Sequence, residues 1–214
     1  MLTVQTFTFN PVQENTYLVY NEEGACCIID PGCYFASEEK VLSDFITTSG
    51  LKPVLLLNTH CHLDHIFGNR FVQRTWGLEL HLHRLEEPVL ELGPASGQLW
   101  QLPFENYDGP RHFLDEGDAV RIGSDELHVL FTPGHSPGSI TFYQPVQRFA
   151  IAGDVLFNGS VGRTDLPGGS FQLLEESIRT KLYTLPEDVI VYPGHGGSTT
   201  IGDERRDNPF VKMP

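Results

Sequence analysis

The sequence lacks the long apolar segments found in membrane-spanning and secreted proteins. None of its apolar runs approaches the roughly 18 residues that a membrane-spanning helix needs. Its first residues, MLTVQTFTFN, contain no basic stretch followed by a long apolar segment, so they are not typical of a secretory signal. Its 4 cysteines form no C-x-x-C pair and are too sparse for a disulfide scaffold. We therefore expect a cytoplasmic protein with reduced thiols and no membrane partner.

Basic residues are also scarce. Lysine and arginine total 14 against 28 aspartates and glutamates, which gives a net charge of -14. Such a chain repels phosphate backbones, and its adjacent basic pair Arg205-Arg206 has acids on both sides, so we expect no nucleic-acid partner. With 214 residues, 40% of them hydrophobic, the chain can bury a core without disulfides. We expect one domain over residues 1–214; no pattern indicates an oligomeric state.

Short apolar bursts separated by turn residues occupy the beginning of the chain. LTVQTFTF, NTYLVYN and ACCIID are divided by Asn10-Pro11 and Glu23-Gly24, a pattern that predicts three strands. ASEEKVLSDFITTSG then predicts a helix with Ser37 as its N-cap and Gly50 at its end. KPVLLLN is an unbroken apolar run, which predicts a buried strand that leads directly into THCHLDH.

The rest of the chain continues this alternation of strands and helices. HIFGNRFVQRTW predicts a helix ended by Gly77, and LELHLHR predicts a strand. Residues 93–110 are rich in glycine, proline and aromatics, and predict a long functional loop. Further strands are expected in AVRIG, ELHVLFT, SITFYQ, RFAIAGD and DVIVYP, with a helix beginning near Ser170. The sequence thus predicts one α/β domain with two similar halves.

The stretch THCHLDH concentrates three imidazoles, a carboxylate and a thiol. His60 and His62 are two residues apart and can point the same way in an extended chain. Asp64 and His65 begin a helix, where adjacent side chains diverge by roughly 100°. Four such ligands would crowd one tetrahedral ion, so we expect the first pair to bind one ion and the second pair another. Structural zinc sites stop at four ligands, usually with cysteines, which argues against a closed structural site.

Each ion then needs further ligands from elsewhere in the chain. His135 and His195 each follow a Pro-Gly turn after a predicted strand, and Asp154 closes the strand FAIAGD, where it could bridge two ions. Imidazole and carboxylate suit zinc, iron or manganese. The predicted metal ligands are His60, His62, Asp64, His65, His135, Asp154 and His195.

Other histidines and the cysteines are expected to have structural roles. His81 and His83 share a predicted strand face, but no carboxylate or third histidine lies nearby in sequence to complete a metal site. We therefore expect them at the surface or in the wall of a site rather than as ligands. The vicinal pair Cys26 and Cys27 is expected to pack as small core residues. Cys61 lies between two predicted ligands and is expected to face away from them.

These residues resemble the metallo-β-lactamase superfamily. The resemblance rests on the motif H-x-H-x-D-H at 60–65 with the later histidines and Asp154, and it covers most of the chain. It implies the family's fold, a four-layered αββα sandwich with the metals at one edge. It also implies one ion bound by His60, His62 and His135, a second bound by Asp64, His65 and His195, and Asp154 as the bridge. By the same resemblance, Asp30 at the end of CIID orients a ligand histidine from outside the ligand set.

Further features place the resemblance in one branch of the family. True β-lactamases lack an acid at the position of Asp154, which is similar instead to the glyoxalase II, persulfide dioxygenase and lactonase branches. GRTDLPGG at 162–169 and the ending GDERRDNPF resemble short bacterial glyoxalase II-like proteins and persulfide dioxygenases. The resemblance implies a metal-dependent hydrolase of a thioester such as a hydroxyacylglutathione, a small-molecule substrate derived from glutathione.

In this interpretation a hydroxide between two divalent ions, zinc first and iron or manganese as alternatives, attacks the thioester carbonyl. Asp64 would pass a proton. Arg163 would hold a substrate carboxylate through its planar guanidinium group, unless it is a structural arginine. Two alternatives stay open: persulfide dioxygenation at a single Fe(II) held by His60, His135 and Asp154, and hydrolysis of a lactone or another ester.

Overall fold

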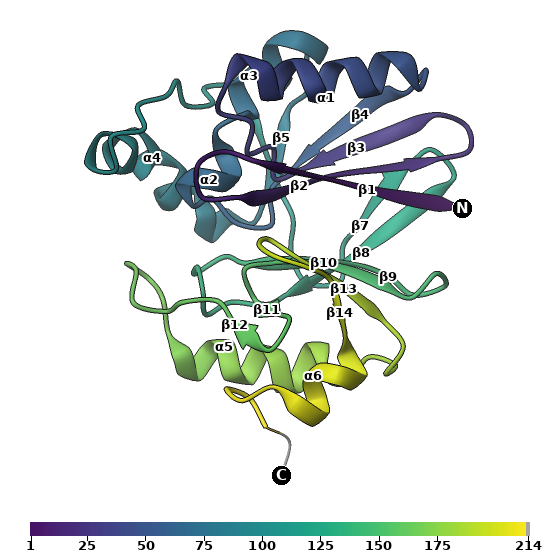
Figure 1. The fold of residues 1–214 in the computed structure, drawn as a ribbon, viewed down its shortest axis with the longest axis vertical. Helices are drawn as coiled ribbons and strands as arrows, with labels where there is room; N and C mark the ends of the chain where they lie inside the picture. Colours follow the sequence, from purple (N-terminus) through teal and green to yellow (C-terminus); the bar gives the residue numbers. More distant parts are fainter. Residues whose placement is uncertain (213–214) are drawn as a thin grey trace. The chain divides into compact units, whose positions relative to one another are not determined.

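The computed structural model describes residues 1–212, which cluster into two compact units. The first unit contains Met1–Leu114 and Arg121–Glu126, and the second contains Asp115–Val120 and the described residues from Leu127 onward. A six-stranded sheet forms the centre of each unit (Figure 1). The α/β class expected from the sequence is confirmed.

The first sheet has the strand order β1-β2-β3-β4-β5-β6. Its strands are β1 (Leu2–Phe9), β2 (Glu14–Asn21), β3 (Ala25–Ile29), β4 (Lys52–Leu57), β5 (Leu80–Leu82) and β6 (Arg111–Phe113). The pairs β1–β2 and β2–β3 are antiparallel, whereas β3, β4, β5 and β6 run parallel. Because the carboxyl ends of parallel strands meet at one edge, the segments that follow β3, β4 and β5 share that edge.

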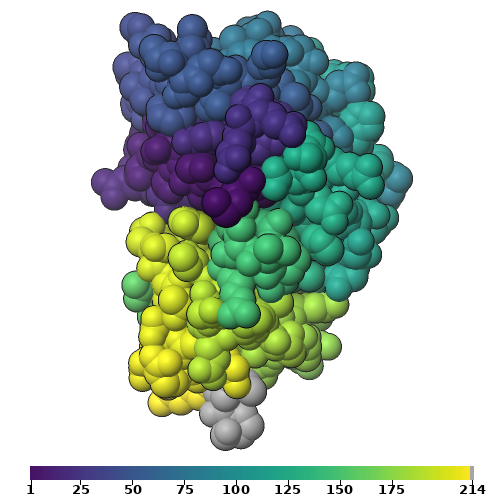
Figure 2. All heavy atoms as spheres, turned by 90° about the vertical axis from the view of Figure 1, so that its right-hand side faces the viewer, coloured from purple at the N-terminus to yellow at the C-terminus, as the bar shows by residue number. Residues whose placement is uncertain are grey.

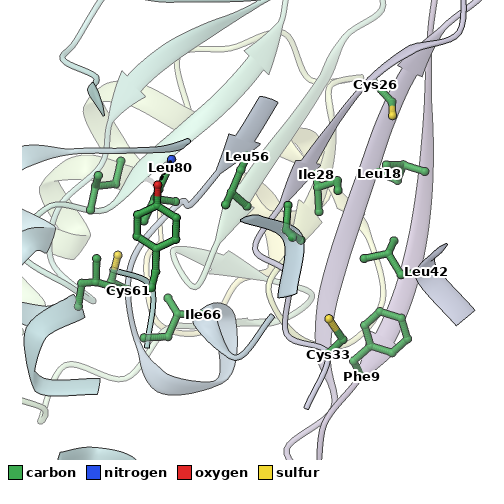
Figure 3. Close-up of a cluster of buried hydrophobic side chains, with 14 of the residues drawn as sticks. Phe9, Leu18, Cys26, Ile28, Cys33, Leu42, Leu56, Cys61, Ile66 and Leu80 are labelled. Carbon is green, nitrogen blue, oxygen red and sulfur yellow. Dashed lines mark hydrogen bonds between the residues drawn. The ribbon is translucent and has the colours of Figure 1, made fainter. Parts of the chain in front are cut away.

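Helices pack on this sheet and close the first core. They are α1 (Ala36–Thr48), α2 (Leu63–Ile66), α3 (Asn69–Trp76) and α4 (Glu87–Leu99), with the 3-10 turn η1 (Arg84–Glu86) before α4. Each helix contributes an apolar side chain to one buried cluster: Leu42, Ile66, Val72 and Leu90. Figure 3 shows this cluster, where leucine and isoleucine side chains of the strands meet those of the helices.

The second sheet has the strand order β14-β13-β10-β9-β8-β7. Its strands are β7 (Ala119–Ile122), β8 (Asp125–Phe131), β9 (Ile140–Gln144), β10 (Phe149–Gly153), β13 (Ile190–Pro193) and β14 (Thr199–Thr200). A separate hairpin consists of β11 (Leu156–Phe157) and β12 (Ser160–Val161). Because β10 and β13 pair in parallel, the residues that follow them emerge side by side.

Two helices cover the second core. Helix α5 (Phe171–Ser177) continues into a π-helical turn at Ile178–Leu182, and α6 (Ile201–Asp207) follows β14 directly. Their buried apolar side chains join those of β10 and β13 in one cluster. The helix predicted from near Ser170 is confirmed, with Ser170 as its N-cap. Helix α6 was not predicted, because its sequence IGDERRD is short and almost entirely polar.

The predicted loop over residues 93–110 is wrong at its start, since α4 continues to Leu99. Gly93 and Gly97, which favoured a loop, are buried on this helix. A β-carbon on either glycine would press against the Phe104 ring. The glycines therefore permit close packing of a helix rather than a turn.

Smaller differences concern the helix ends. Helix α1 begins at Ala36 with Phe35 as its N-cap, so the predicted N-cap Ser37 lies two residues further on, inside the helix. The Glu38 carboxylate accepts hydrogen bonds from the N–H groups of Tyr34 and Phe35, at 2.8 and 3.1 Å, and so satisfies donors at the helix start. The helix predicted after THCHLDH is split into α2 and α3, and it ends at Gly77 as expected.

Within residues 1–212, no helix has the length and apolarity to cross a membrane. The surface in Figure 2 carries the N-terminal strands of the first unit, in purple, and the C-terminal segment of the second unit, in yellow.

Candidate metal-binding residues

The first unit brings together the four predicted ligands of THCHLDH. The chain leaves β4 and runs without regular structure to His62, the N-cap of α2, so that His60 and His62 precede the helix and Asp64 and His65 lie within it. The ring centroids of His60 lie 4.9 Å from His62 and 4.1 Å from His65. His65 Nε2 lies 3.6 Å from Asp64 Oδ2. The predicted positions of one pair before the helix and the other within it are confirmed, and the division of the two pairs between two ions stays a prediction.

Asp30 sits behind these ligands, as the resemblance implied. Its Oδ2 lies 3.1 Å from His65 Nδ1, and its Oδ1 accepts the N–H of Thr59 at 2.7 Å. Thr59 Oγ1 donates to Asp30 Oδ2 at 2.5 Å and lies 3.1 Å from His60 Nδ1. The Nδ1 atoms of two predicted ligand histidines thus contact residues outside the ligand set, an arrangement that suits metal binding through Nε2. Asp30 also has a positive φ of 49°, a strained conformation typical of functional sites.

A second buried acid, Glu14, lies close to His65 and was not predicted. Its Oε1 is 3.9 Å from His65 Nδ1, and its Oε2 accepts from Thr16 Oγ1 at 3.0 Å. Burial raises the pKa of Glu14 well above its ordinary value, although the neighbouring imidazole of His65 opposes the shift. The only sequence signal was an acid at the start of the apolar strand ENTYLVYN, which gave no indication of its target.

Cys61 points into the core, as expected. Its thiol belongs to the buried cluster of Figure 3, and burial raises its pKa well above the ordinary value. Its backbone N–H donates to Glu86 Oε2 at 2.7 Å. The vicinal thiols Cys26 and Cys27 are also fully buried, which confirms their predicted core positions.

The second unit brings together the other three predicted ligands. Asp154 follows β10, His195 follows β13, and His135 lies in the Pro-Gly turn after β8. The Nε2 atoms of His135 and His195 lie 3.5 and 3.6 Å from the same oxygen, Asp154 Oδ2. Two imidazoles converging on one carboxylate oxygen suit the predicted bridging role of Asp154.

The GRTD segment supports this second group through its backbone. His135 Nδ1 lies 2.7 Å from the carbonyl oxygen of Arg163, which directs Nε2 to Asp154. A β-carbon on Gly162 would overlap the Asp154 carbonyl oxygen and approach His135 Nδ1. The sequence predicted a role only for the Arg163 side chain. The contact of the Arg163 carbonyl with His135 and the close backbone approach at Gly162 were not predicted.

The Arg163 side chain itself forms a two-pronged ion pair. Nε and Nη2 bind the two carboxylate oxygens of Asp165 at 2.7 and 2.8 Å, and the Arg163 side chain is 54% exposed. This contact lowers the pKa of Asp165 to about 2. Its predicted contact with a substrate carboxylate stays a prediction.

The C-terminal segment GDERRDNPF also supports the second unit. Buried Glu204 accepts from Thr199 Oγ1 at 2.6 Å and from Asn208 Nδ2 at 2.7 Å, and it accepts the N–H of Gly159 at 3.1 Å. Asn208 Nδ2 also donates to the carbonyl oxygen of Ser160. These bonds join α6 to β14 and to the β11–β12 hairpin, which lies between Asp154 and Arg163 in sequence.

The histidines left out of the ligand set have other partners. His83 Nδ1 accepts the N–H of Leu85 at 3.2 Å and so begins η1. His81 stacks on His112 with ring centroids 4.6 Å apart, and His112 Nε2 lies 2.5 Å from Glu79 Oε2. His81 lies on β5, as predicted. The prediction that His83 shares its strand face is wrong, because β5 ends at Leu82 and the buried His83 caps η1.

The first unit contains a cavity of about 620 Å³ between the start of α1, α3 and residues 103–105. Tyr34, Phe67 and Phe104 form part of its wall. The ring centroid of Phe67 lies 4.7 Å from that of Tyr34 and 5.2 Å from that of Phe104. None of the predicted metal ligands lines it, so this cavity is not assigned to the metal chemistry.

Comparison with known proteins agrees with this arrangement. A family model described as the metallo-beta-lactamase superfamily matches residues 9–195. The chain is 40% identical over 202 residues to the probable metallo-hydrolase YqgX of Bacillus subtilis, a match that covers 94% of this chain and 93% of that protein. It is 36% identical over 212 residues to the hydroxyacylglutathione hydrolase GloC of Haemophilus influenzae, which covers 98% of both.

Solved structures show the same likeness. The B3 metallo-beta-lactamase BLEG-1 is 37% identical, with a TM-score of 0.90, over 99% of this chain and 100% of that one. TTHA1623, solved in a di-iron-bound form, is 40% identical, with a TM-score of 0.87, over 97% of this chain and 100% of that one. The likeness spans nearly all of each protein, so the chain shares their fold, and the fold class expected from the resemblance is confirmed.

Proposed function

The chain belongs to the metallo-β-lactamase superfamily and is a metal-dependent hydrolase, and we propose that its substrate is a thioester such as a hydroxyacylglutathione. The observation that carries this proposal is the shared oxygen of Asp154, which both His135 and His195 approach through Nε2. A carboxylate placed in this way suits two ions bound close together. The likeness to GloC, whose name states that activity, supports the choice of substrate.

The donor set fits divalent metal ions. Within each unit, ligand imidazoles are oriented by outer partners through Nδ1, and carboxylates lie beside Nε2 atoms. We propose two ions per chain, held by the seven ligands that the sequence predicts. Zinc is our first choice because imidazole and carboxylate suit it, and the di-iron form of TTHA1623 supports iron as the alternative.

When bound, the ions would lower the pKa of a coordinated water to about 7 and polarise the thioester carbonyl. Asp64 is assigned the proton transfer in this proposal. Its side chain is 19% exposed, so its carboxylate reaches solvent while lying 3.6 Å from His65 Nε2. Ser and Cys nucleophiles are not needed in this scheme, and Cys61 faces the core.

Arg163 is proposed to bind a carboxylate of the substrate. To do so it would exchange the Asp165 carboxylate for that of the substrate. Both side chains of this ion pair are exposed to solvent. Because surface ion pairs contribute little free energy, a substrate carboxylate can replace that of Asp165 at small cost. We place the activity in the cytoplasm, because all four cysteines are free thiols.

The test is turnover of lactoylglutathione by metal-loaded protein, followed through release of glutathione. His60→Ala and Asp154→Ala should each lower kcat/KM by roughly a thousandfold, or about 4 kcal/mol. His81→Ala is the matched control, since His81 is a histidine outside the ligand set. Full turnover by both ligand variants would disprove the proposal.

Three other reactions are distinguished by substrate. Persulfide dioxygenation would consume oxygen in the presence of glutathione persulfide and depend on a single tightly bound iron. Hydrolysis of a β-lactam is supported by the likeness to BLEG-1, and of a lactone or another ester by the family. Oxygen uptake with the persulfide, absent in metal-free protein, or a higher kcat/KM for a β-lactam or lactone than for lactoylglutathione, would replace our choice.

A further inference from the structure

Two buried acids hold the backbone of the ligand loop in the first unit. The sheet order places β4, which leads into this loop, between β3 and β5. Asp30 follows β3 and accepts the N–H of Thr59 at 2.7 Å. Glu86 comes shortly after β5 and accepts the N–H of Cys61 at 2.7 Å. The ligand loop is therefore bonded to an acid from each flanking strand, and the resemblance accounts only for Asp30.

The bond from Glu86 acts between two metal ligands. Cys61 separates His60 from His62, and this part of the chain belongs to no strand or helix that would pair its N–H groups. A buried N–H without an acceptor destabilises the fold, and a carboxylate is a stronger acceptor than a neutral group. Fixing the Cys61 N–H fixes the peptide plane between His60 and Cys61, and hence the directions of the neighbouring imidazoles.

The position of Glu86 shows that its carboxylate is directed to the loop rather than to its own helix. Glu86 is the N-cap of α4, yet its side chain forms no capping bond with that helix. The residue is 0% exposed, and burial of a carboxylate is costly unless it gains hydrogen bonds. Its backbone is held by η1, whose first turn is capped by His83. The carboxylate thus reaches Cys61 from a rigid support.

We propose that Glu86 is a positioning residue for His60 and His62, acting through the Cys61 backbone. It touches neither metal nor substrate. The inference rests on the metal centre of the proposed function but not on the identity of the substrate. A loop that lacks this bond would present the two imidazoles in several orientations and would bind metal less tightly.

The test uses cobalt(II) as the probe, because its visible absorption reports ligand geometry. Cobalt binding is measured by titration against a competing chelator for wild-type protein and for Glu86→Ala, Glu86→Asp and Glu86→Gln. The Ala and Asp variants remove or withdraw the acceptor, and we expect cobalt affinity to fall about 10- to 100-fold, with an altered spectrum. Glu86→Gln keeps an acceptor oxygen and should restore most of the affinity and the wild-type spectrum.

Glu87→Gln is the matched control, since Glu87 is the next residue, is 36% exposed and pairs with Arg111. It should bind cobalt like the wild type. The melting temperature of each metal-free variant is measured in parallel. A Glu86→Asp variant with wild-type cobalt affinity and spectrum would overturn the proposal, and so would a loss of metal-free stability alone. Because no substrate is used, a failure of thioester hydrolysis would leave this result intact.

Discussion

The carboxylate of Asp30 and the imidazole of His65 face one another in the interior of the first unit, with Oδ2 3.1 Å from Nδ1. Both side chains are buried, so neither group can obtain its hydrogen bond from bulk water. The contact orients the imidazole ring and places the proton on Nδ1 when the ring is neutral.

Asp30→Asn should therefore weaken metal binding without removing a ligand. The amide can keep one acceptor oxygen, but it loses the negative charge that supports both His65 and Thr59. We expect zinc affinity to fall about 10- to 100-fold, measured by competition with a chelator. Asp44→Asn is the control, because Asp44 is an exposed acid paired with Lys40 on α1. Equal affinities in both variants would contradict this role for Asp30.

Glu14→Gln should stabilise the metal-free protein at neutral pH. Burial raises the Glu14 pKa, so its protonated form is favoured in the folded state. The stability linked to that proton is fully present below the unfolded pKa of about 4.3 and is lost as pH rises through the folded value. Glutamine resembles the protonated form, so its advantage should be absent in acid and reach on the order of 1 kcal/mol near neutrality.

This pH dependence is measured by urea unfolding of both metal-free proteins from about pH 4 to pH 8. Glu22→Gln serves as the control, since Glu22 is an exposed acid in the turn directly after β2. A constant difference between Glu14→Gln and the wild type at every pH would show that Glu14 does not bind a proton on folding.

The candidate metal ligands could be picked out from the sequence because their chemistry is concentrated in it, and their role as ligands stays a prediction. THCHLDH places four ligands side by side, and the remaining three occur at the ends of apolar runs that predict strands. The residues that hydrogen-bond to the candidate ligands were predictable only where a family pattern marked them, as for Asp30. Glu14, Glu86 and Glu204 are buried acids that each contact a residue far away in sequence: His65, Cys61 and Gly159, respectively. No local spacing indicated these contacts.

Local signals also failed where tertiary packing decided the structure. Gly93, Pro94 and Gly97 favoured a loop, yet they lie inside α4 because the small residues allow Phe104 to approach the helix. Strand β6 was missed for a related reason, since RHF has no apolar run and pairs with β5 through its backbone. Pattern and composition cannot report such contacts before the fold is known.

The thiols should resist modification in the folded protein. All four cysteines are buried and free, and burial raises the pKa of Cys26 to about 12 and that of the others in the same direction. Near pH 8 we expect slow reaction with a thiol reagent in native protein and full reaction of all four in denaturant.

The same pKa shifts predict a loss of stability in alkali. The contribution of the buried thiols is fully present below their unfolded pKa of about 8.5 and falls as pH rises above it. The urea midpoint should therefore decrease between about pH 8 and pH 10. Replacing Cys26 by alanine should lessen this decrease, and an identical decrease in that variant would exclude its thiol as a contributor.

Gly162→Ala should disrupt the ligands of the second unit although it changes no ligand. The added β-carbon would overlap the Asp154 carbonyl oxygen and press on the ring nitrogen of His135 that binds the Arg163 carbonyl. Relief of this overlap requires movement of the backbone, for which we expect a cost of roughly 2 kcal/mol and a loss of bound zinc. Gly197→Ala is the control, since its β-carbon would meet nothing within 4 Å. Zinc content by atomic emission and the unfolding midpoint are measured for both, and a Gly162→Ala protein that keeps its full zinc content would contradict the prediction.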